Sequence, residues 1–384
     1  MNKSIYDKLK IIGIKTLRCG THLFSFFPIK KGRVLLSSYL GESYSCNPKY
    51  ISEYLQKNYP EKFEIVWAFK DTNKFQDISA SKIIKYKSIS WFYYTITANV
   101  IIGNNAAMWI PRRKGQLIID TWHGGGCYKK VAADNKESSE LAKYRTKISG
   151  KEVNLYLSSS KYFSDNVVRK SFMYDGEILS SGMPRNDVLF VKDINFINKI
   201  RTEIAAKYNF SSEDVIVLFA PTWRKGRLRS EQLDIVMVKR AVSSKVGKSV
   251  VVLGRGHHTE SGILEKNVID VSDFPDMQKL LIASDILITD YSSSMWDYSF
   301  TEKPCFLFTP DLEIYEKTPG FDRDIHSWGF PVCETNDQLE SEIYRFDQED
   351  YLKRMETHHA SLGNYENGTA CRQVCDYINK FANC

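Results

Sequence analysis

Short apolar runs alternate with helix-length segments along most of this chain, and this alternation constrains its fold more than any other feature. The runs are rich in β-branched and aromatic residues, and the first series covers residues 33–39, 64–69, 83–86, 100–103, 117–120, 155–158 and 177–179. Helix-length segments lie between most of them, for example at residues 48–57, 90–98 and 161–173. Strands that alternate with helices are typical of a parallel, doubly wound α/β sheet.

The same pattern restarts after an amphipathic segment at residues 194–208. The second series of apolar runs covers residues 215–219, 249–253, 268–271, 286–289 and 305–308. A chain of 384 residues is also long for a single hydrophobic core. We therefore predict two Rossmann-like domains, at residues 33–195 and 196–384, after an N-terminal segment at residues 1–32. The packing of a predicted helix at residues 370–381 stays open.

The N-terminal segment is strongly basic. Residues 1–33 contain eight lysines and arginines but a single acidic residue, Asp7, and this excess equals the formal net charge of +7. On a helical wheel the basic residues lie on one side, and Ile11 and Ile14 depart from the pattern. The other side carries Ile5, Leu9, Ile12, Cys19, Leu23 and Phe27. Such a basic amphipathic helix is typical of attachment to an anionic membrane surface; the alternative is a terminal helix that packs on the first domain.

The charge, apolar runs and cysteines of the rest of the chain indicate where in the cell the protein acts and which partners it binds. Because residues 34–384 are neutral overall, we expect no nucleic-acid partner. No apolar run reaches the length that a membrane-spanning helix needs. The eight cysteines are scattered without a C-x-x-C pair, which is typical of reduced thiols in the cytoplasm. We therefore expect a peripheral protein at the cytoplasmic face of the cell membrane.

Small hydroxyl residues and carboxylates follow the apolar run at residues 286–289. Asp290 comes first, Ser292 and Ser293 follow, and a predicted helix then carries Asp297. The first backbone N–H groups of a helix lack partners within it, and its dipole is positive there, so such a junction can bind phosphate. The alternative is an ordinary serine cap at the start of a helix.

Four other strand ends carry similar chemistry. His123 is followed by three glycines, whose backbone can approach a ligand closely, and histidine is suited to take a proton near neutral pH. The other three ends offer groups for an anionic ligand, and they are Arg185, Asn186 and Asp187; Thr222 and Arg224; and Arg255 and His257. Structural roles, such as a histidine beside a glycine turn or a helix start at Asn186, are the alternatives. Five such ends at the carboxyl edges of parallel sheets predict a nucleotide-diphosphate site between the domains.

In this order, the motifs resemble those of the CDP-glycerol glycerophosphotransferases. This family includes primases and polymerases of teichoic acids and related polyol-phosphate transferases of capsule synthesis. The shared blocks are His123-Gly124, Gly-Met-Pro-Arg-Asn-Asp at 182–187, Ala-Pro-Thr-Trp-Arg at 220–224, Arg255 with His257, and Thr-Asp-Tyr-Ser-Ser at 289–293. The resemblance covers about residues 34–345, and the combination is specific although each piece is weak. It implies the GT-B fold, in which two Rossmann-like domains face each other across a cleft.

The resemblance also implies an activity, the transfer of glycerol phosphate from CDP-glycerol to a hydroxyl of a lipid-linked or polysaccharide acceptor, with release of CMP. His123 matches the family's proposed base, and His257 matches its second essential histidine. Ser292 and Ser293 match its phosphate-binding serines, and the carboxylates of Asp290 and Asp297 would brace that loop or meet the glycerol. Arginines and backbone N–H groups could neutralise the developing charge, so we expect no cofactor and no metal.

Three features leave alternatives open. Gly125-Gly126-Cys127 replaces the Thr-Pro pair that usually follows the His-Gly of this family, which leaves the acceptor and the number of units added undetermined. The donor could instead be CDP-ribitol, or a nucleotide sugar used by a GT-B glycosyltransferase, and a non-catalytic nucleotide-binding protein is a third class. The Asp-Arg-Asp sequence at 322–324 resembles a metal-binding motif of other glycosyltransferases, but it lies in a predicted loop.

Overall fold

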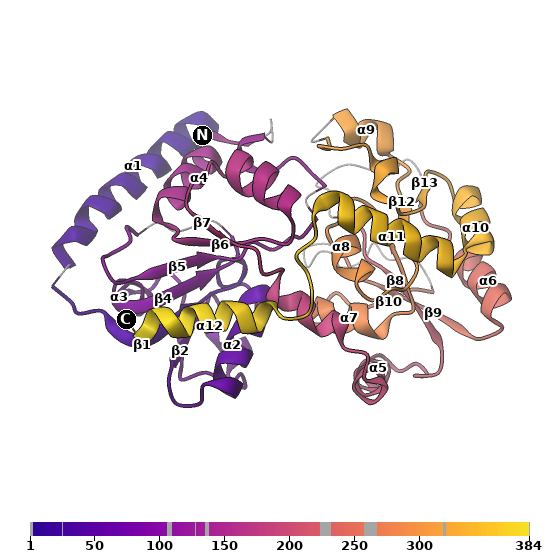
Figure 1. Ribbon diagram of the computed structural model, residues 1–384, viewed down its shortest axis with the longest axis horizontal. Coiled ribbons are helices and arrows are strands. Elements are labelled where there is room, and N and C mark those ends of the chain that lie inside the picture. The colour runs from indigo at the N-terminus through magenta and orange to yellow at the C-terminus, as the bar shows by residue number, and fades with distance from the viewer. Residues whose placement is uncertain are drawn as a thin grey trace. The chain divides into compact units, whose positions relative to one another are not determined.

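The computed structural model describes residues 3–24, 26–105, 110–126, 128–134, 138–222, 232–256, 267–317 and 320–383. They form two compact units, each built around one parallel sheet (Figure 1). The first unit comprises Met1–Gly125, Val131–Asp187 and Asn364–Cys384, and the second comprises Gly126–Lys130 and Val188–Gly363.

The described sheet of the first unit has seven strands in the order β3-β2-β1-β4-β5-β6-β7, and each is parallel to its neighbours. The bounds are β1 Lys30–Leu36, β2 Glu64–Phe69, β3 Lys82–Lys85, β4 Ala98–Gly103, β5 Leu117–Asp120, β6 Leu155–Leu157 and β7 Glu177–Leu179. The strand order reverses between β1 and β4, which is the position where open α/β sheets bind ligands.

Helices cover both faces of this sheet (Figure 1). On one face, α2 (Cys46–Asn58) and α12 (Ala370–Asn383) bury their apolar residues against the strands, among them Ile51, Leu55, Val374 and Ile378. The other face is covered by α3 (Ile89–Thr97) and α4 (Glu140–Glu152), and α1 (Lys3–Thr21) packs on α4. A π-helix spans Phe163–Ser171. Since both faces are buried, the strands are continuous apolar runs rather than alternating ones.

The described sheet of the second unit has six parallel strands in the order β10-β9-β8-β11-β12-β13, and the order reverses between β8 and β11. Its strands are β8 Val215–Phe219, β9 Val250–Gly254, β10 Ile269–Asp270, β11 Ile286–Thr289, β12 Cys305–Phe308 and β13 Val332–Cys333. Its helices are α5 Ile194–Tyr208, α6 Ile235–Val246, α7 Met277–Ala283, α8 Ser294–Ser299, α9 Leu312–Lys317, α10 Asn336–Arg345 and α11 Gln348–Leu362. Helices α6 and α10 share one buried core on one face of the sheet.

The twelve predicted strands all form, and the prediction of an α/β protein with two parallel sheets is confirmed. Strand β13, Val332–Cys333, is absent from the prediction because Pro331 and Glu334 flank its two apolar residues, which leaves no recognisable apolar run.

The two units differ from the predicted domain ranges of 33–195 and 196–384. The first unit includes the C-terminal helix α12, whose apolar face is buried on its sheet. Both carboxylate oxygens of Asp187 accept backbone N–H groups at the start of α12, from Ala370 at 2.9 Å and Cys371 at 2.7 Å. Apolar burial and this cap together explain why the C-terminal segment returns to the first unit.

Helix α1 packs on α4 through the two isoleucines that departed from the predicted wheel. Ile14 is buried against Leu141 and Ile148, and Ile11 packs beside it. Arg18 forms an ion pair with Glu152 of α4. The predicted apolar side of α1 remains at the surface, where the side chains of Ile5, Leu9 and Ile12 are 52%, 56% and 59% exposed. None of the helices that the structure describes is long and apolar enough to cross a membrane.

We predict that Asp187→Ala loosens the attachment of α12 to the first unit. Loss of a side chain that caps a helix typically lowers the free energy of unfolding by about 1 kcal/mol. Amide hydrogen exchange of residues 370–383 should therefore speed up in the variant, by about fivefold for that energy.

The matched control is Asp193→Ala, which removes the side-chain cap of α5 in the second unit. This control should leave exchange in α12 at the wild-type rate. Unchanged exchange in α12 of the Asp187→Ala variant would contradict the capping role.

Candidate functional site

His123 lies at the carboxyl edge of the first sheet, three residues after β5, and its side chain is half-buried. Its ring Nδ1 is 2.7 Å from the backbone carbonyl oxygen of Asn104, which directly follows β4. A carbonyl oxygen can only accept, so Nδ1 carries the proton of the neutral ring and Nε2 keeps its lone pair. The structure therefore presents Nε2 as the basic nitrogen of His123.

The loop that carries His123 is held by the buried side chain of Asn47. Its Nδ2 donates to the carbonyl oxygens of Thr121 at 3.2 Å and Trp122 at 3.1 Å. Trp122 has a φ of 50°, in the left-handed region, and its N–H donates to the Asp120 carboxylate at 2.8 Å. Asn47 could not be predicted from the sequence, because nothing there indicates that a residue more than seventy positions away supports this loop.

Arg185 supports the same loop from another strand end. Its guanidinium donates to the carbonyl oxygen of His123 at 2.7 Å and to the Sγ of Cys46 at 3.3 Å. Its backbone N–H donates to Asn47 Oδ1 at 3.1 Å. With 5% of its surface exposed, Arg185 positions the backbone of His123. Its predicted contact with a donor phosphate stays a prediction.

Asn186 and Asp187 hold the C-terminal segment of the first unit. Asn186 donates to Oε1 of Glu366 at 2.9 Å, while Oε2 of Glu366 accepts the N–H of Met183 at 2.9 Å. Burial raises the pKa of Asp187, and the two N–H groups of α12 partly offset this shift. Gly182 has a φ of +80°, and an added Cβ would lie 2.6 Å from Oε2 of Glu366, so this turn requires glycine. Donor binding by Asn186 and Asp187 also stays a prediction.

In the second unit, Asp290 connects the two strand ends at the reversal of the sheet. Its Oδ1 accepts the backbone N–H of Thr222 at 2.8 Å, after β8. Asn104 of the first unit makes the equivalent bond, because its Oδ1 accepts the N–H of Tyr39 beyond β1 at 2.8 Å. In each unit, a side-chain oxygen therefore holds together the two loops that diverge at the reversal of the sheet.

Ser292 and Ser293 lie between β11 and α8, and phosphate binding at this junction stays a prediction. The Oγ of Ser292 accepts the backbone N–H of Ser294 at 3.3 Å and the Ser294 hydroxyl at 3.0 Å. Ser293 precedes α8 and makes no side-chain cap to it. Asp297 is 2% exposed and accepts from Gln278 Nε2 at 3.1 Å, which braces α8 against α7.

Of the predicted residues Arg224, Arg255 and His257, the structure describes Arg255. The backbone N–H of Arg255 donates to the Phe219 carbonyl at 2.9 Å, so Arg255 continues the pairing of β8 with β9 at the carboxyl edge. Arg224 and His257 lie outside the described residues, as does His258.

A lysine that sequence analysis missed lies at the end of β8. Lys129 Nζ is 3.3 Å from Oγ1 of Thr222 and donates to it. The segment Gly126–Lys130 follows His123 in the chain but belongs to the second unit, where Lys129 pairs with the backbone of Phe321. The Lys-Lys pair that follows the glycines was the available signal. Gly126 has a φ of +67°, in the left-handed region, which proline cannot adopt because its φ is fixed near −65°.

Tyr128 anchors this segment in the second unit. Its hydroxyl is 2.9 Å from Nε2 of His358, and its ring packs on that of Trp328 with centroids 4.4 Å apart. Burial lowers the pKa of His358 to about 3, so the ring is neutral near pH 7.

Comparison with known proteins identifies the family. The model of the family CDP-Glycerol:Poly(glycerophosphate) glycerophosphotransferase matches residues 21–380. The chain belongs to this glycerophosphotransferase family. It is 30% identical over 373 residues to the teichoic acid poly(glycerol phosphate) polymerase of Staphylococcus epidermidis, covering 92% of this chain and 51% of that protein. It is 27% identical to the teichoic acid glycerol-phosphate transferase of Staphylococcus aureus, covering 91% and 93%.

The fold of this glycerophosphotransferase family member agrees with a solved relative. A variant of the wall teichoic acid polymerase TagF soaked with CDPG superimposes with a TM-score of 0.82 and 27% identity, covering 100% of this chain and 98% of that one. The chain spans about half the length of the polymerases of S. epidermidis and Bacillus subtilis, 51% and 47% respectively. The predicted family resemblance is confirmed.

We predict that acidification destabilises the second unit through His358. The unfolded ring has a pKa of 6.5 and the folded ring about 3, so between these values the unfolded state binds a proton that the folded state excludes. The free energy of unfolding should therefore fall as the pH falls through this window, by at most about 1.4 kcal/mol per pH unit. His358→Gln keeps an acceptor for Tyr128 and should weaken the pH dependence, measured by urea unfolding at pH 7.5 and 5.0.

Exposed His326 supplies the matched control, and His326→Gln should retain the pH dependence of the wild type. A His358→Gln variant with the full wild-type pH dependence would show that this histidine is not the group responsible.

Proposed function

We propose that this protein transfers glycerol phosphate from CDP-glycerol to a hydroxyl of a lipid-linked or polysaccharide acceptor, with release of CMP. The pathway is the synthesis of teichoic acid or of a related capsular polysaccharide. Membership of the glycerophosphotransferase family supports the donor and the reaction class. The observation that carries the proposal is the hydrogen bond from His123 Nδ1 to the Asn104 carbonyl, because it leaves Nε2 as a base at a sheet edge.

In this mechanism, Nε2 of His123 removes the proton of the acceptor hydroxyl. The acceptor oxygen attacks the phosphorus that carries glycerol, and the bond from this phosphorus to the oxygen of CMP breaks. Phosphoryl transfer depends mainly on in-line positioning and on stabilisation of the charge that develops. Asn47 and Arg185 serve the first requirement, because they fix the backbone on both sides of the His123 ring.

The second unit supplies the groups for the donor diphosphate in this proposal. Ser292 and Ser293 offer hydroxyl groups after β11, and Lys129 offers a positive charge beside Thr222 after β8. Both strand ends flank the reversal of the sheet, where nucleotides bind in related folds. Arg224 and Arg255 add positive charge for the diphosphate in this proposal, and His257 stabilises the leaving CMP. The predicted donor contacts of Arg185, Asn186, Asp187, Asp290 and Asp297 belong to the same proposal, as does a GT-B arrangement that needs no metal.

CDP-ribitol is the second candidate donor. The chain is 26% identical over 376 residues to the teichoic acid ribitol-phosphate primase of Bacillus spizizenii, covering 94% of both proteins. A nucleotide-sugar donor has weaker support. A solved UDP-N-acetylglucosamine 2-epimerase from Listeria monocytogenes has a TM-score of 0.52 at 11% identity, a likeness that extends to the fold alone.

We also propose that α1 attaches the protein to an anionic membrane at its cytoplasmic face. Besides Ile5, Leu9 and Ile12, the side chains of Leu23 and Phe26 are 77% and 73% exposed. Lys8, Lys10 and Lys15 of the same helix are also exposed. Exposed apolar residues beside basic ones are the combination that holds an interfacial helix on acidic lipid.

We predict that CMP is released only when CDP-glycerol and a lipid-linked glycan acceptor are both present. His123→Ala should lower kcat at least a hundredfold, the usual contribution of a general base, and should leave the Kd of CDP-glycerol nearly unchanged. Measurements of CMP release and isothermal titration with CDP-glycerol test the two statements.

His326→Ala is the control for loss of an exposed histidine and should keep wild-type turnover. Release of UDP from UDP-sugars in place of CMP would refute the proposed reaction. A large loss of CDP-glycerol binding by His123→Ala would contradict the assignment of His123 as the base.

We predict that Ile5→Ser/Leu9→Ser/Ile12→Ser abolishes co-sedimentation with vesicles that contain phosphatidylglycerol. Deletion of residues 1–27 should do the same. The triple variant leaves the contacts of Ile14 with α4 in place, so the first unit should keep its thermal stability. Val236→Ser removes an apolar side chain that is 62% exposed on the second unit and should bind vesicles like the wild type. Continued sedimentation of the triple variant would refute attachment through α1.

A further inference from the structure

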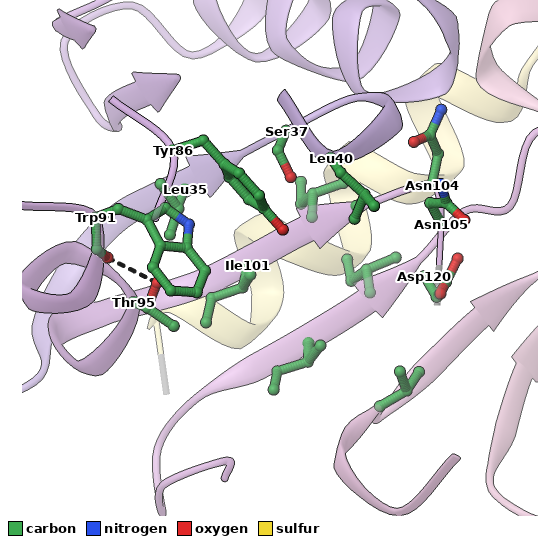
Figure 2. A pocket seen from close by; sticks show the side chains of 15 residues that line it. Leu35, Ser37, Leu40, Tyr86, Trp91, Thr95, Ile101, Asn104, Asn105 and Asp120 are labelled. Carbon is green, nitrogen blue, oxygen red and sulfur yellow. Dashed lines mark hydrogen bonds between the residues drawn. The ribbon is translucent and has the colours of Figure 1, made fainter. Parts of the chain in front are cut away.

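A cavity of about 70 Å³ lies between the first sheet and α3, at the reversal of the strand order. The ends of β1, β4 and β5 form its floor, and α3 contributes Trp91 and Thr95. Figure 2 shows that the labelled polar side chains of Asn104, Asn105 and Asp120 gather at one end, while Tyr86 and Trp91 lie at the other.

Asn104 connects this cavity with His123. Its backbone carbonyl accepts from the His123 ring, and its Oδ1 accepts from the N–H of Tyr39. Its side chain is 1% exposed, and no residue that the structure describes gives Nδ2 a hydrogen-bond partner. A buried donor without a partner destabilises the protein by about 1–3 kcal/mol. A ligand oxygen in the cavity that accepts a hydrogen bond from Nδ2 would remove this cost.

The lining favours a neutral ligand over a phosphate. Among the lining residues that the structure describes there is no lysine or arginine, and Asp120 adds a carboxylate that is 4% exposed. An anion would therefore be desolvated without a counter-charge. Hydroxyl groups, by contrast, can accept from Asn104 Nδ2 and donate to Asp120, while the carbon chain contacts the rings of Tyr86 and Trp91.

The size of the cavity indicates how large this ligand is. A buried water needs about 10–15 Å³ of cavity volume, so a cavity of about 70 Å³ has room for about five to seven atoms of that size. Glycerol, with six non-hydrogen atoms, fits this range, and a hexose ring is about twice as large.

We propose that this cavity is a subsite for the terminal neutral polyol unit of the acceptor, a glycerol-sized triol or diol that Asn104 and Asp120 hold by its hydroxyl groups. The hydroxyl next to Asn104 then lies beside the residue that fixes His123. The inference rests on the proposed function, since it assigns the place of the acceptor in that reaction. The acceptor end is thus recognised by hydroxyl groups rather than by charge.

Gly103 offers a direct test because it lines the cavity and ends β4. An added Cβ would meet nothing within 4 Å, and its φ lies outside the left-handed region. Gly103→Val should therefore fold, since valine suits a strand, and its side chain should fill the cavity. The matched control is Gly13→Val on α1, where an added Cβ also meets open space.

The second variant, Asn104→Asp, keeps an acceptor for the N–H of Tyr39 and replaces the Nδ2 donor with an oxygen. Binding is measured by saturation-transfer NMR with glycerol and, separately, with glycerol 3-phosphate, in the absence of CDP-glycerol. We expect glycerol to bind the wild type and Gly13→Val equally, and at least tenfold more weakly to Gly103→Val and Asn104→Asp. Glycerol 3-phosphate should not compete with glycerol.

Three results would overturn this subsite: no glycerol binding by the wild type, undiminished binding by folded Gly103→Val or by Asn104→Asp, or equal binding of glycerol 3-phosphate. If thermal unfolding shows that Gly103→Val does not fold, glycerol binding by Asn104→Asp alone tests the subsite. Because the assay contains no donor, its outcome is independent of CMP release. Absence of CMP release would refute the proposed function and leave the glycerol measurement unaffected.

Discussion

In each unit, a hydrogen bond from a backbone N–H to a polar side chain joins the loops that separate where the strand order reverses. In the first unit Asn104 accepts from Tyr39, and in the second Asp290 accepts from Thr222. Beyond the last paired residue of each strand, a backbone N–H has no neighbouring strand to bond, and leaving it buried without a partner is costly. A short polar side chain at this position meets that need and fixes both loops. The arrangement of both candidate edges depends on these two bonds.

Around His123, the polar motif residues of the first unit mostly bind other parts of the protein. Arg185 holds the backbone of His123, Asn186 holds Glu366, and Asp187 caps α12. A motif can therefore be characteristic of a family because it positions a reactive group, without any contact with the substrate. The two serines of the second unit differ, since Ser292 and Ser293 are half-buried, whereas Asp290 and Asp297 are buried and bind other parts of the protein.

Much of the fold could be predicted because each strand is a local apolar run, and a buried parallel strand needs no distant information to be recognised. The edge that carries His123 and the junction of Ser292 could be predicted for the same reason, since they directly follow such runs. The residues that hold the His123 loop and the C-terminal segment could not be predicted. Asn47 bonds to Thr121, 74 positions away, and Asn186 bonds to Glu366, 180 positions away. Such pairs depend on tertiary packing, which local patterns do not contain. The return of α12 to the first unit was unpredictable in the same way.

That return has a consequence for the order of events during synthesis. Residues 1–187 are made before α12 and contain the seven described strands of the first sheet together with α2, but the part of the sheet face that α12 covers stays open until α12 is made. At typical rates of about 5–20 residues per second, the 176 residues of Val188–Gly363 delay that cover by about ten to thirty-five seconds. During this interval the apolar residues of α2 and of the strands that face α12 form an open apolar surface that a nascent-chain chaperone can bind.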